Sequence, residues 1–170
     1  MTEPTVPAHA PAHAHIRRAE ERDIPELHRL LREVLEVHHA GRPDLFRAGT
    51  AKYTDRELAA LLTSEDTPVF GMFADDDVTL LGYAFCAFQR HEGSNILTDV
   101  LTLYIDDICV DEPARGCHVG TALYRHVLEF ARAAGCHNVT LNVWSCNPGA
   151  QAFYERLGLK PYKVGMEQLL

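Results

Sequence analysis

The amino-acid sequence predicts a single mixed α/β domain. Segments with strand-like and helix-like patterns follow one another in the order β-α-α-β-β-β-α-β-α-β, and no internal repeat divides them. A chain of 170 residues is also long enough for one domain with a sizeable core.

The first 14 residues differ in composition from the rest. They are rich in Pro, Ala, Thr and His and contain almost no large apolar side chain, so we expect 1–14 to be a disordered tail and 15–170 to be the domain. His9, His13 and His15 could chelate a metal ion, but a solvated tail is the favoured interpretation and we expect no metal site.

The domain is predicted to open with a short strand and a long helix. The strand covers His15 to Ala19. The helix begins after Asp23, a plausible N-cap followed by Pro25 in the first turn, and it ends near Gly41 and Pro43. Its apolar and ring-bearing residues recur at helical spacing: Ile24, Leu27, Leu30, Leu31, Val34, Leu35 and His38.

A second helix, from Asp55 to Leu62, and three strands are predicted to follow. The segments Pro68–Phe73 and Thr79–Gln89 read as a hairpin whose turn holds Asp75 to Asp77. The third strand covers Val100 to Val110.

The last third of the chain alternates helix and strand. A helix over Thr121–Ala134 is ended by Gly135, and a strand over Val139–Trp144 follows. Asn147 is expected to cap another helix, and Pro161–Leu169 could form a final strand.

Composition narrows the class of function. Asp and Glu outnumber Lys and Arg by 24 to 16, which argues against nucleic-acid binding and is compatible with a cationic substrate, although mild acidity for solubility is equally common. There is no apolar run of roughly 20 residues and no apolar signal region, so we expect a cytoplasmic protein without a membrane partner. No cysteine forms a C-x-x-C pair, which favours reduced thiols over zinc at Cys86, Cys109, Cys117, Cys136 and Cys146.

The turn from Arg115 to Thr121 is the most informative stretch. It lies between a predicted strand and the start of a predicted helix, where backbone N–H groups lack intrahelical partners and the helix dipole is positive. Arg115 adds a fixed cation with forked donors. This pattern is typical of a phosphate-binding site.

The order of motifs resembles the GNAT N-acetyltransferase family. The residues that carry the resemblance are Ile108-Cys109-Val110, the glycine-bearing turn at 115–121, and Asn147 spaced seven residues before Tyr154 in the segment Ala152-Phe153-Tyr154-Glu155-Arg156-Leu157-Gly158. The resemblance covers about Ile16 to the C-terminus. It implies a central mixed sheet of about six to seven strands, splayed at the cofactor site and flanked by about four helices, and often a homodimer.

The resemblance also implies acetyl-CoA as the acetyl donor. Its pyrophosphate would lie on the backbone amides of Gly116, Cys117, His118, Val119, Gly120 and Thr121, beside Arg115. Its pantetheine arm would pair with Ile108, Cys109 and Val110, and Asn147 could bind nearby. One position departs from the family: His118 stands where a glycine is usual, so the histidine must accept a glycine-like backbone or turn its side chain away.

Transfer of an acetyl group to an amine needs a base and an acid. The resemblance implies Tyr154 as the acid that protonates the leaving thiolate, with aromatic packing as the alternative. The stretch around Asp106 and Asp107 is similar to the Leu-Tyr-Leu-Glu-Asp strand of diamine acetyltransferases, which aligns Asp106 with the base, acting through water. Asp107 would be structural or would position the acceptor, and strict alternation puts the two carboxylates on opposite faces.

Several further residues are expected near the acceptor. Trp144 lies where acceptor and cofactor would meet, and the segment holding His38 and Phe46 borders the acceptor site in the family. Asn142 stands where some peptide N-terminal acetyltransferases of the family carry a Glu base, which weakens that mechanism here.

The favoured hypothesis is an acetyl-CoA-dependent N-acetyltransferase that acts on a small cationic amine such as a polyamine. A protein, peptide or amino-acid acceptor is the alternative within the same class. A non-catalytic acyl-CoA-binding regulatory module is the alternative outside it, and a cysteine hydrolase using Cys109 is disfavoured because no histidine has a diagnostic spacing.

Overall fold

A computed structural model describes residues 13–170, so most of the expected tail lies outside the described part. Its regular elements, in chain order, are β1 (His15–Arg18), α1 (Ile24–Gly41), α2 (Asp55–Thr63), β2 (Val69–Phe73), β3 (Leu80–Gln89), β4 (Thr102–Val110), α3 (Val119–Ala133), β5 (Asn138–Leu141) and α4 (Pro148–Arg156), with short 3-10 turns η1 (Glu21–Asp23) and η2 (Glu112–Ala114).

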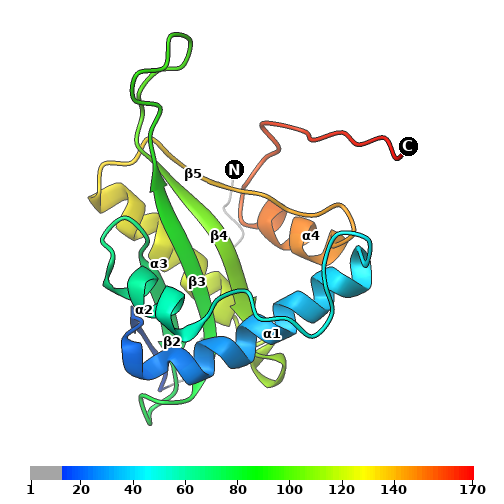
Figure 1. The fold of residues 1–170 in the computed structure, drawn as a ribbon. Helices are drawn as coiled ribbons and strands as arrows, with labels where there is room; N and C mark the ends of the chain where they lie inside the picture. The colour runs from blue at the N-terminus through cyan, green and yellow to red at the C-terminus, as the bar shows by residue number, and fades with distance from the viewer. Residues whose placement is uncertain (1–12) are drawn as a thin grey trace, which may run out of the picture.

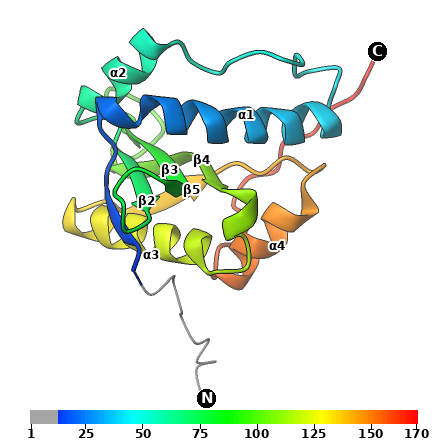
Figure 2. The same ribbon diagram turned by 90° about the horizontal axis from the view of Figure 1, so that it is seen from below.

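The five strands form one sheet in the order β1-β2-β3-β4-β5. The first four are antiparallel neighbours, whereas β5 runs parallel to β4. Figure 2 shows the sheet between two helical layers, with α1 and α2 on one side and α3 and α4 on the other. The mixed α/β prediction is therefore confirmed.

The core has two halves, one on each face of the sheet. Leu27 and Leu30 of α1 pack with Leu58 of α2 against Tyr83 and its neighbours, all fully buried. On the other face, α3 buries an apolar stripe against β4: Leu123, Val127 and Ala131 over Leu103 and Ile105. The helical spacing of these residues puts them on one side of each helix, which is why the sequence pattern identified them.

Side-chain hydrogen bonds order the backbone just before each of the first two helices. The Asp23 carboxylate does not cap α1; it accepts a hydrogen bond from the Glu20 N–H at 2.8 Å and from both Nη atoms of Arg17, and so closes the η1 turn. At α2, Thr54 and Glu57 form a reciprocal capping box. No helix among the described residues is long and apolar enough to span a bilayer.

Two strand predictions were wrong. The sheet has five strands rather than six to seven, because residues 157–170 contain no strand. A strand needs a neighbour for its backbone hydrogen bonds, and no edge of the sheet pairs with this segment in the described chain. In addition, β5 stops at Leu141, three residues short of Trp144, because it diverges from β4 there.

Candidate active site

The gap between β4 and β5 is the central feature of the site. The two strands pair only from Thr102 opposite Asn138 to Ile105 opposite Leu141, whereas β4 continues to Val110. In the described chain, the β5-facing edge of residues 106–110 therefore has no strand partner, and apart from the Val110 carbonyl oxygen, which binds Arg115, its outward backbone groups can pair with an extended ligand. The predicted pantetheine-binding residues 108–110 lie on this free edge. Figure 1 shows β5 leaving β4 and crossing toward α4.

The predicted phosphate turn follows directly at the end of β4. It leads through η2 into α3, whose first residue is Val119. His118 is the N-cap of α3, and its side chain makes no capping hydrogen bond, so the first N–H groups of the helix are not satisfied by it. Gly120 lies in this first turn, and a Cβ added to it would lie 3.2 Å from Phe153 Cζ and 3.3 Å from Val110 Cγ2. The turn thus combines free amides with close packing of β4, α3 and α4.

His118 adopts the conformation that a glycine would favour. Its φ is 61° and its ψ is 13°, in the left-handed region, and Gly116 also has a positive φ of 82°. Of the two expected possibilities, the histidine therefore accepts a glycine-like backbone. The histidine bears a strain of about 1–2 kcal/mol that a glycine would not.

Arg115 lies across the end of β4. Its Nε donates to the carbonyl oxygen of Val110 at 3.2 Å, and its Nη2 lies 3.5 Å from Glu33 Oε2 on α1. That oxygen is buried and has no hydrogen-bond partner. Burial, together with the negative charge of Asp111, raises the pKa of Glu33. Two cations compensate its charge: Arg29, whose Nη1 lies 3.5 Å from Glu33 Oε1, and Arg115 at the mouth of the turn.

A bulge in β4 determines how the acid pair points. Ile105 faces Cys86 and Asp107 faces Phe85, so Asp106 is an extra residue without a partner in β3. The expectation that the two carboxylates lie on opposite faces was wrong, because the bulge interrupts alternation. Both carboxylates bind side chains on the face of the sheet that α1 and α2 cover.

Each carboxylate has its own partners. Asp106 Oδ2 accepts a hydrogen bond from Lys52 Nζ at 2.7 Å and lies 3.5 Å from the Tyr53 hydroxyl, both from the connection between α1 and α2. Asp107 Oδ2 accepts from the hydroxyl of buried Tyr83 at 2.8 Å. Burial raises the pKa of Asp107, although the positive charge of Lys52 and the Tyr83 hydrogen bond oppose this. Lys52, Tyr53 and Tyr83 were missed in the sequence, because they lie 54, 53 and 24 residues from their partners.

Tyr154 approaches the gap from α4. Its ring packs against Phe153 and Tyr124, with centroid distances of 5.1 and 6.4 Å. Burial raises the pKa of the Tyr154 hydroxyl, and the negative charge of Asp107 adds to the effect. The hydroxyl is thus protonated at neutral pH, and the raised pKa makes it a weaker acid than an exposed tyrosine. The protonated state is the one that an acid for a leaving thiolate requires.

The residues expected around the acceptor fall into two groups. Three form an aromatic wall, in which the Phe46 ring lies 4.9 Å from His38 and 5.2 Å, edge-on, from Trp144. The two asparagines have structural partners: Asn147 accepts from the Ala150 N–H and caps α4, and Asn142 donates to the Tyr104 hydroxyl. Close approach of α1 to this region depends on Gly41, since an added Cβ would lie 2.6 Å from Cys146 Sγ.

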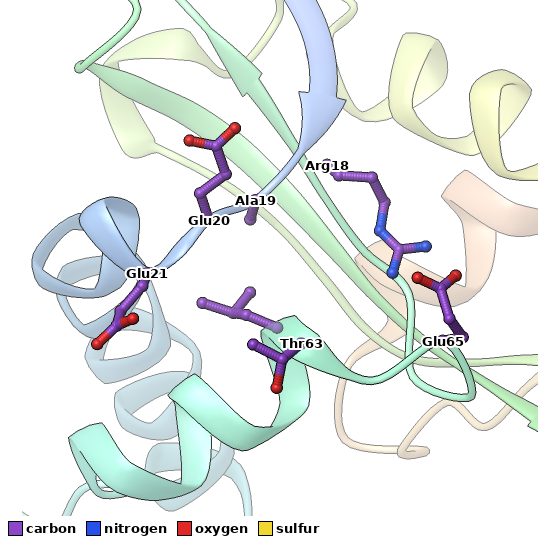
Figure 3. A pocket seen from close by; sticks show the side chains of 7 residues that line it. Arg18, Ala19, Glu20, Glu21, Thr63 and Glu65 are labelled. Atoms are coloured by element: carbon purple, nitrogen blue, oxygen red, sulfur yellow. The ribbon is translucent and has the colours of Figure 1, made fainter.

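Two other features do not fit a reaction centre. Burial raises the pKa of the Cys109 thiol to about 12, which opposes a role as nucleophile. A surface pocket of about 460 Å³ lies between β1, η1 and α2, as Figure 3 shows, and it is lined by Arg18, Ala19, Glu20, Glu21, Leu62, Thr63 and Glu65. None of the sequence-predicted site residues belongs to it.

Comparison with known proteins agrees with this geometry. The curated glucosamine 6-phosphate N-acetyltransferase 1 of Oryza sativa subsp. japonica is 35% identical over 63 residues, which cover 37% of this chain and 36% of that protein. The matching part thus spans only about a third of this curated relative.

Solved structures match over a longer range. A mutant of the BH1408 protein from Bacillus halodurans superposes with a TM-score of 0.86 at 29% identity, covering 92% of this chain and 99% of that one. An aminoglycoside acetyltransferase from an uncultured soil sample, bound to sisomicin, has a TM-score of 0.67 over 92% of this chain and 96% of its own, and at 18% identity it shows the fold alone. The sequence profile of the acetyltransferase (GNAT) family matches residues 26–159, and the chain belongs to that family.

Proposed function

We propose that this protein is an acetyl-CoA-dependent N-acetyltransferase whose acceptor is a small primary amine, with a cationic amine such as a polyamine favoured. The observation that carries the proposal is the convergence of three features on one gap: free amides at the start of α3, the unpaired edge of β4, and the acid pair in the β4 bulge. We further propose a cytoplasmic homodimer, as the sequence suggests.

The residues present fit acetyl-CoA. The amides at the start of α3 and the Arg115 guanidinium suit a pyrophosphate, since they offer donors and positive charge without a competing side-chain cap. The free backbone of residues 108–110 suits the amide groups of the pantetheine arm. Acetyl-CoA supplies the acetyl group as a thioester, and the chain's own residues must bind it and manage the protons.

The acceptor amine must lose a proton before it can attack. A lysine-like amine has a pKa of about 10.4, so the neutral form costs roughly 4–5 kcal/mol at pH 7. We propose that Asp106 receives this proton through water. Support comes from its place in the bulge beside the gap and from the ammonium group that it already binds. The second carboxylate, Asp107, adds negative charge that favours a cationic acceptor.

The leaving thiolate needs a proton. We assign Tyr154 as the donor, because its position seven residues after Asn147 matches the family motif and its hydroxyl carries a proton at neutral pH. The aromatic wall of His38, Phe46 and Trp144 is the proposed border of the acceptor site.

Thiol release from acetyl-CoA, measured over a panel of amines, tests the proposal. The panel contains polyamines, amino acids, aminoglycosides, peptides and, in view of the rice relative, glucosamine 6-phosphate. We expect turnover with small amines, and a loss of about 10²–10⁴-fold in kcat/KM for Asp106→Asn and for Tyr154→Phe. Tyr162→Phe, on an exposed tyrosine outside the site, is the matched control.

Each contradictory outcome has a distinct meaning. Full turnover by both variants would overturn the residue roles. Preferred turnover of peptides or free amino acids would replace the acceptor class. Calorimetric binding of acetyl-CoA without turnover across the panel would favour the regulatory module, and absence of binding would overturn the proposal as a whole.

A further inference from the structure

Lys52 is an unusual lysine for this chain. The sequence holds only three lysines, and the other two, Lys160 and Lys163, lie after α4 in a segment without regular structure. Lys52 instead lies in the connection between α1 and α2, and its ammonium nitrogen is 2.7 Å from Asp106 Oδ2. Its side chain is only 30% exposed.

The neighbours of Lys52 hold it in this place. Tyr53 stacks on Phe85 of β3 with a centroid distance of 5.9 Å and an interplanar angle of 20°. The following residue, Thr54, is fixed by the capping box of α2. The Lys52 ammonium group also lies 5.4 Å from the centre of the Tyr53 ring. The packing of Tyr53 and the capping box of Thr54 thus hold the backbone beside Lys52 and keep its primary amine next to Asp106.

The position of this amine relative to the gap is chemically informative. Asp106 is the first β4 residue beyond the last β4–β5 pair, Ile105 with Leu141. A pantetheine arm that enters from the start of α3 and follows residues 110 to 108 has its thioester end directed toward Asp106. Lys52 therefore occupies the place that the proposed reaction requires of an acceptor amine.

We propose that Lys52 is a self-acetylation site of this enzyme. The inference rests on the proposed acetyltransferase function. In the step, the Lys52 ammonium gives one proton to the Asp106 carboxylate, and its nitrogen forms an amide bond with the acetyl carbon. The bond between that carbon and sulfur breaks, and the thiolate takes a proton from the Tyr154 hydroxyl. Tyr154 is restored by the proton held on Asp106, relayed through water. The second proton of the attacking nitrogen is released to solvent, so the products are acetyl-lysine, coenzyme A as the thiol, and one proton.

Acetylation would change the charge of the acceptor site. Burial disfavours the Lys52 cation, but the hydrogen bond with Asp106 and the negative charge of Asp107 outweigh this and raise the pKa of Lys52. The unmodified amine is therefore a bound cation that an external cationic acceptor must displace. Acetyl-Lys52 has no charge and leaves both carboxylates to the acceptor, so modification is expected to favour polycationic amines.

The main experiment needs no knowledge of the acceptor. The full-length protein is incubated with acetyl-CoA carrying an isotope-labelled acetyl group, digested with a protease that cleaves after glutamate, and analysed by mass spectrometry. We expect the label on Lys52 to appear at least about ten-fold faster than on Lys160 or Lys163, because tethering raises its effective concentration. The rate should not depend on protein concentration, and it should fall in Tyr154→Phe.

Acetyl phosphate serves as a reagent that labels lysines without the enzyme's help, and the same Lys52 selectivity with it would overturn the inference. Equal labelling of the three lysines by acetyl-CoA would do so as well. If external amines are acetylated while Lys52 stays unlabelled, this inference fails and the proposed function stands. If acetyl-CoA neither binds nor is turned over, both fail.

A second measurement tests the consequence for acceptor charge. Lys52→Gln removes the cation and imitates the acetylated side chain, whereas Lys52→Arg keeps the charge. We expect Lys52→Gln to lower KM for a tri- or tetracationic amine about ten-fold, the equivalent of roughly 1.4 kcal/mol, with little change for a monocationic amine. An unchanged KM for polycations would overturn this consequence.

Discussion

At the scale of single residues, Asp107 combines two properties that oppose each other energetically. It is a carboxylate, and it lies largely buried against Tyr83 on the α1 side of the sheet. Burial raises the pKa of Asp107, so its ionised form costs the folded state more than the unfolded chain. The proposed role of Asp107 in binding the acceptor would therefore come at the expense of stability.

We therefore predict that Asp107→Asn stabilises the fold at neutral pH. The asparagine oxygen can still accept the Tyr83 hydrogen bond, and the desolvated charge is removed. The pKa of Asp107 is higher in the folded state than in the unfolded chain. Its ionisation therefore lowers the free energy of unfolding of the wild type at pH values above the folded-state pKa, and this loss is absent below the unfolded-state pKa. The gain in the free energy of unfolding, about 1.4 kcal/mol per unit of pKa elevation, should thus be present at pH 7 and shrink as the pH falls toward 4.

Urea denaturation at the two pH values measures this gain, and activity toward cationic amines should fall in the same variant. A variant that is less stable than the wild type at pH 7 would show that the ionised carboxylate has compensating contacts. Asp106→Asn is the matched comparison, because its carboxylate is considerably exposed and paired with Lys52.

His118 is a second proposed site residue with an energetically unfavourable feature, in this case its backbone conformation. Its positive φ predicts that His118→Gly will raise the free energy of unfolding by about 1 kcal/mol, since glycine adopts this backbone without strain. Binding of coenzyme A, measured by calorimetry, should be unchanged or tighter. A loss of affinity would show instead that the imidazole itself contacts a phosphate. His118→Ala, which removes the imidazole but keeps a Cβ at the positive φ, is the control.

At the scale of elements, the sequence was most informative where local chemistry decides the structure. Asn147 was predicted to cap a helix and does so, whereas Asp23, the predicted cap of α1, makes no capping hydrogen bond. Helix ends at glycine and apolar stripes at helical spacing were equally predictable. These features depend on residues at most four positions apart, so they can be read from one segment alone.

Features that depend on distant segments were not predictable. The β4 bulge at Asp106 results from how β3 and β4 align, and no residue type marks it. The contact of Lys52 with Asp106 spans 54 positions. The strand expected over 161–169 has a suitable apolar alternation, but it lacks a neighbouring strand in the described chain. Motif spacing gave the proposed site, and tertiary pairing decided how its carboxylates point.

The meeting of β4, α3 and α4 at Gly120 gives a prediction at this scale. An added side chain there would press on Val110 and on Phe153, the neighbour of Tyr154, so Gly120→Val should move α4 relative to the gap. We expect a destabilisation of about 1–3 kcal/mol from overpacking and a fall in kcat beyond that caused by unfolding. Gly149→Ala on α4 is the control, since its added Cβ would meet nothing closer than 3.8 Å. If folded Gly120→Val had an unchanged kcat, the packing around Gly120 would not be what positions Tyr154.

At the scale of the whole molecule, the C-terminal segment stands apart from the domain. Figure 1 shows it extending away from α4. Arg42 binds the Glu167 carboxylate through two contacts of 2.9 Å. The large apolar side chains of the segment are nevertheless exposed: Tyr162, Val164, Met166, Leu169 and Leu170. A row of exposed apolar groups is typical of a surface that another chain covers, and among the described residues the β5 edge of the sheet has no outer neighbour.

We predict that this segment is the contact through which the expected homodimer forms. If a second copy supplies the missing neighbour, the alternating apolar residues can form the strand that one chain alone cannot hold. Light scattering coupled to size exclusion should give a dimer for the wild type and a monomer for the double variant Val164→Asp and Met166→Asp, because charges on this row oppose burial. Lys163→Asp changes the net charge by the same two units on the opposite face of such a strand and should leave the dimer intact. A monomeric wild type would show that the homodimer does not form. A dimer that persists in the double variant would show that the contact lies elsewhere.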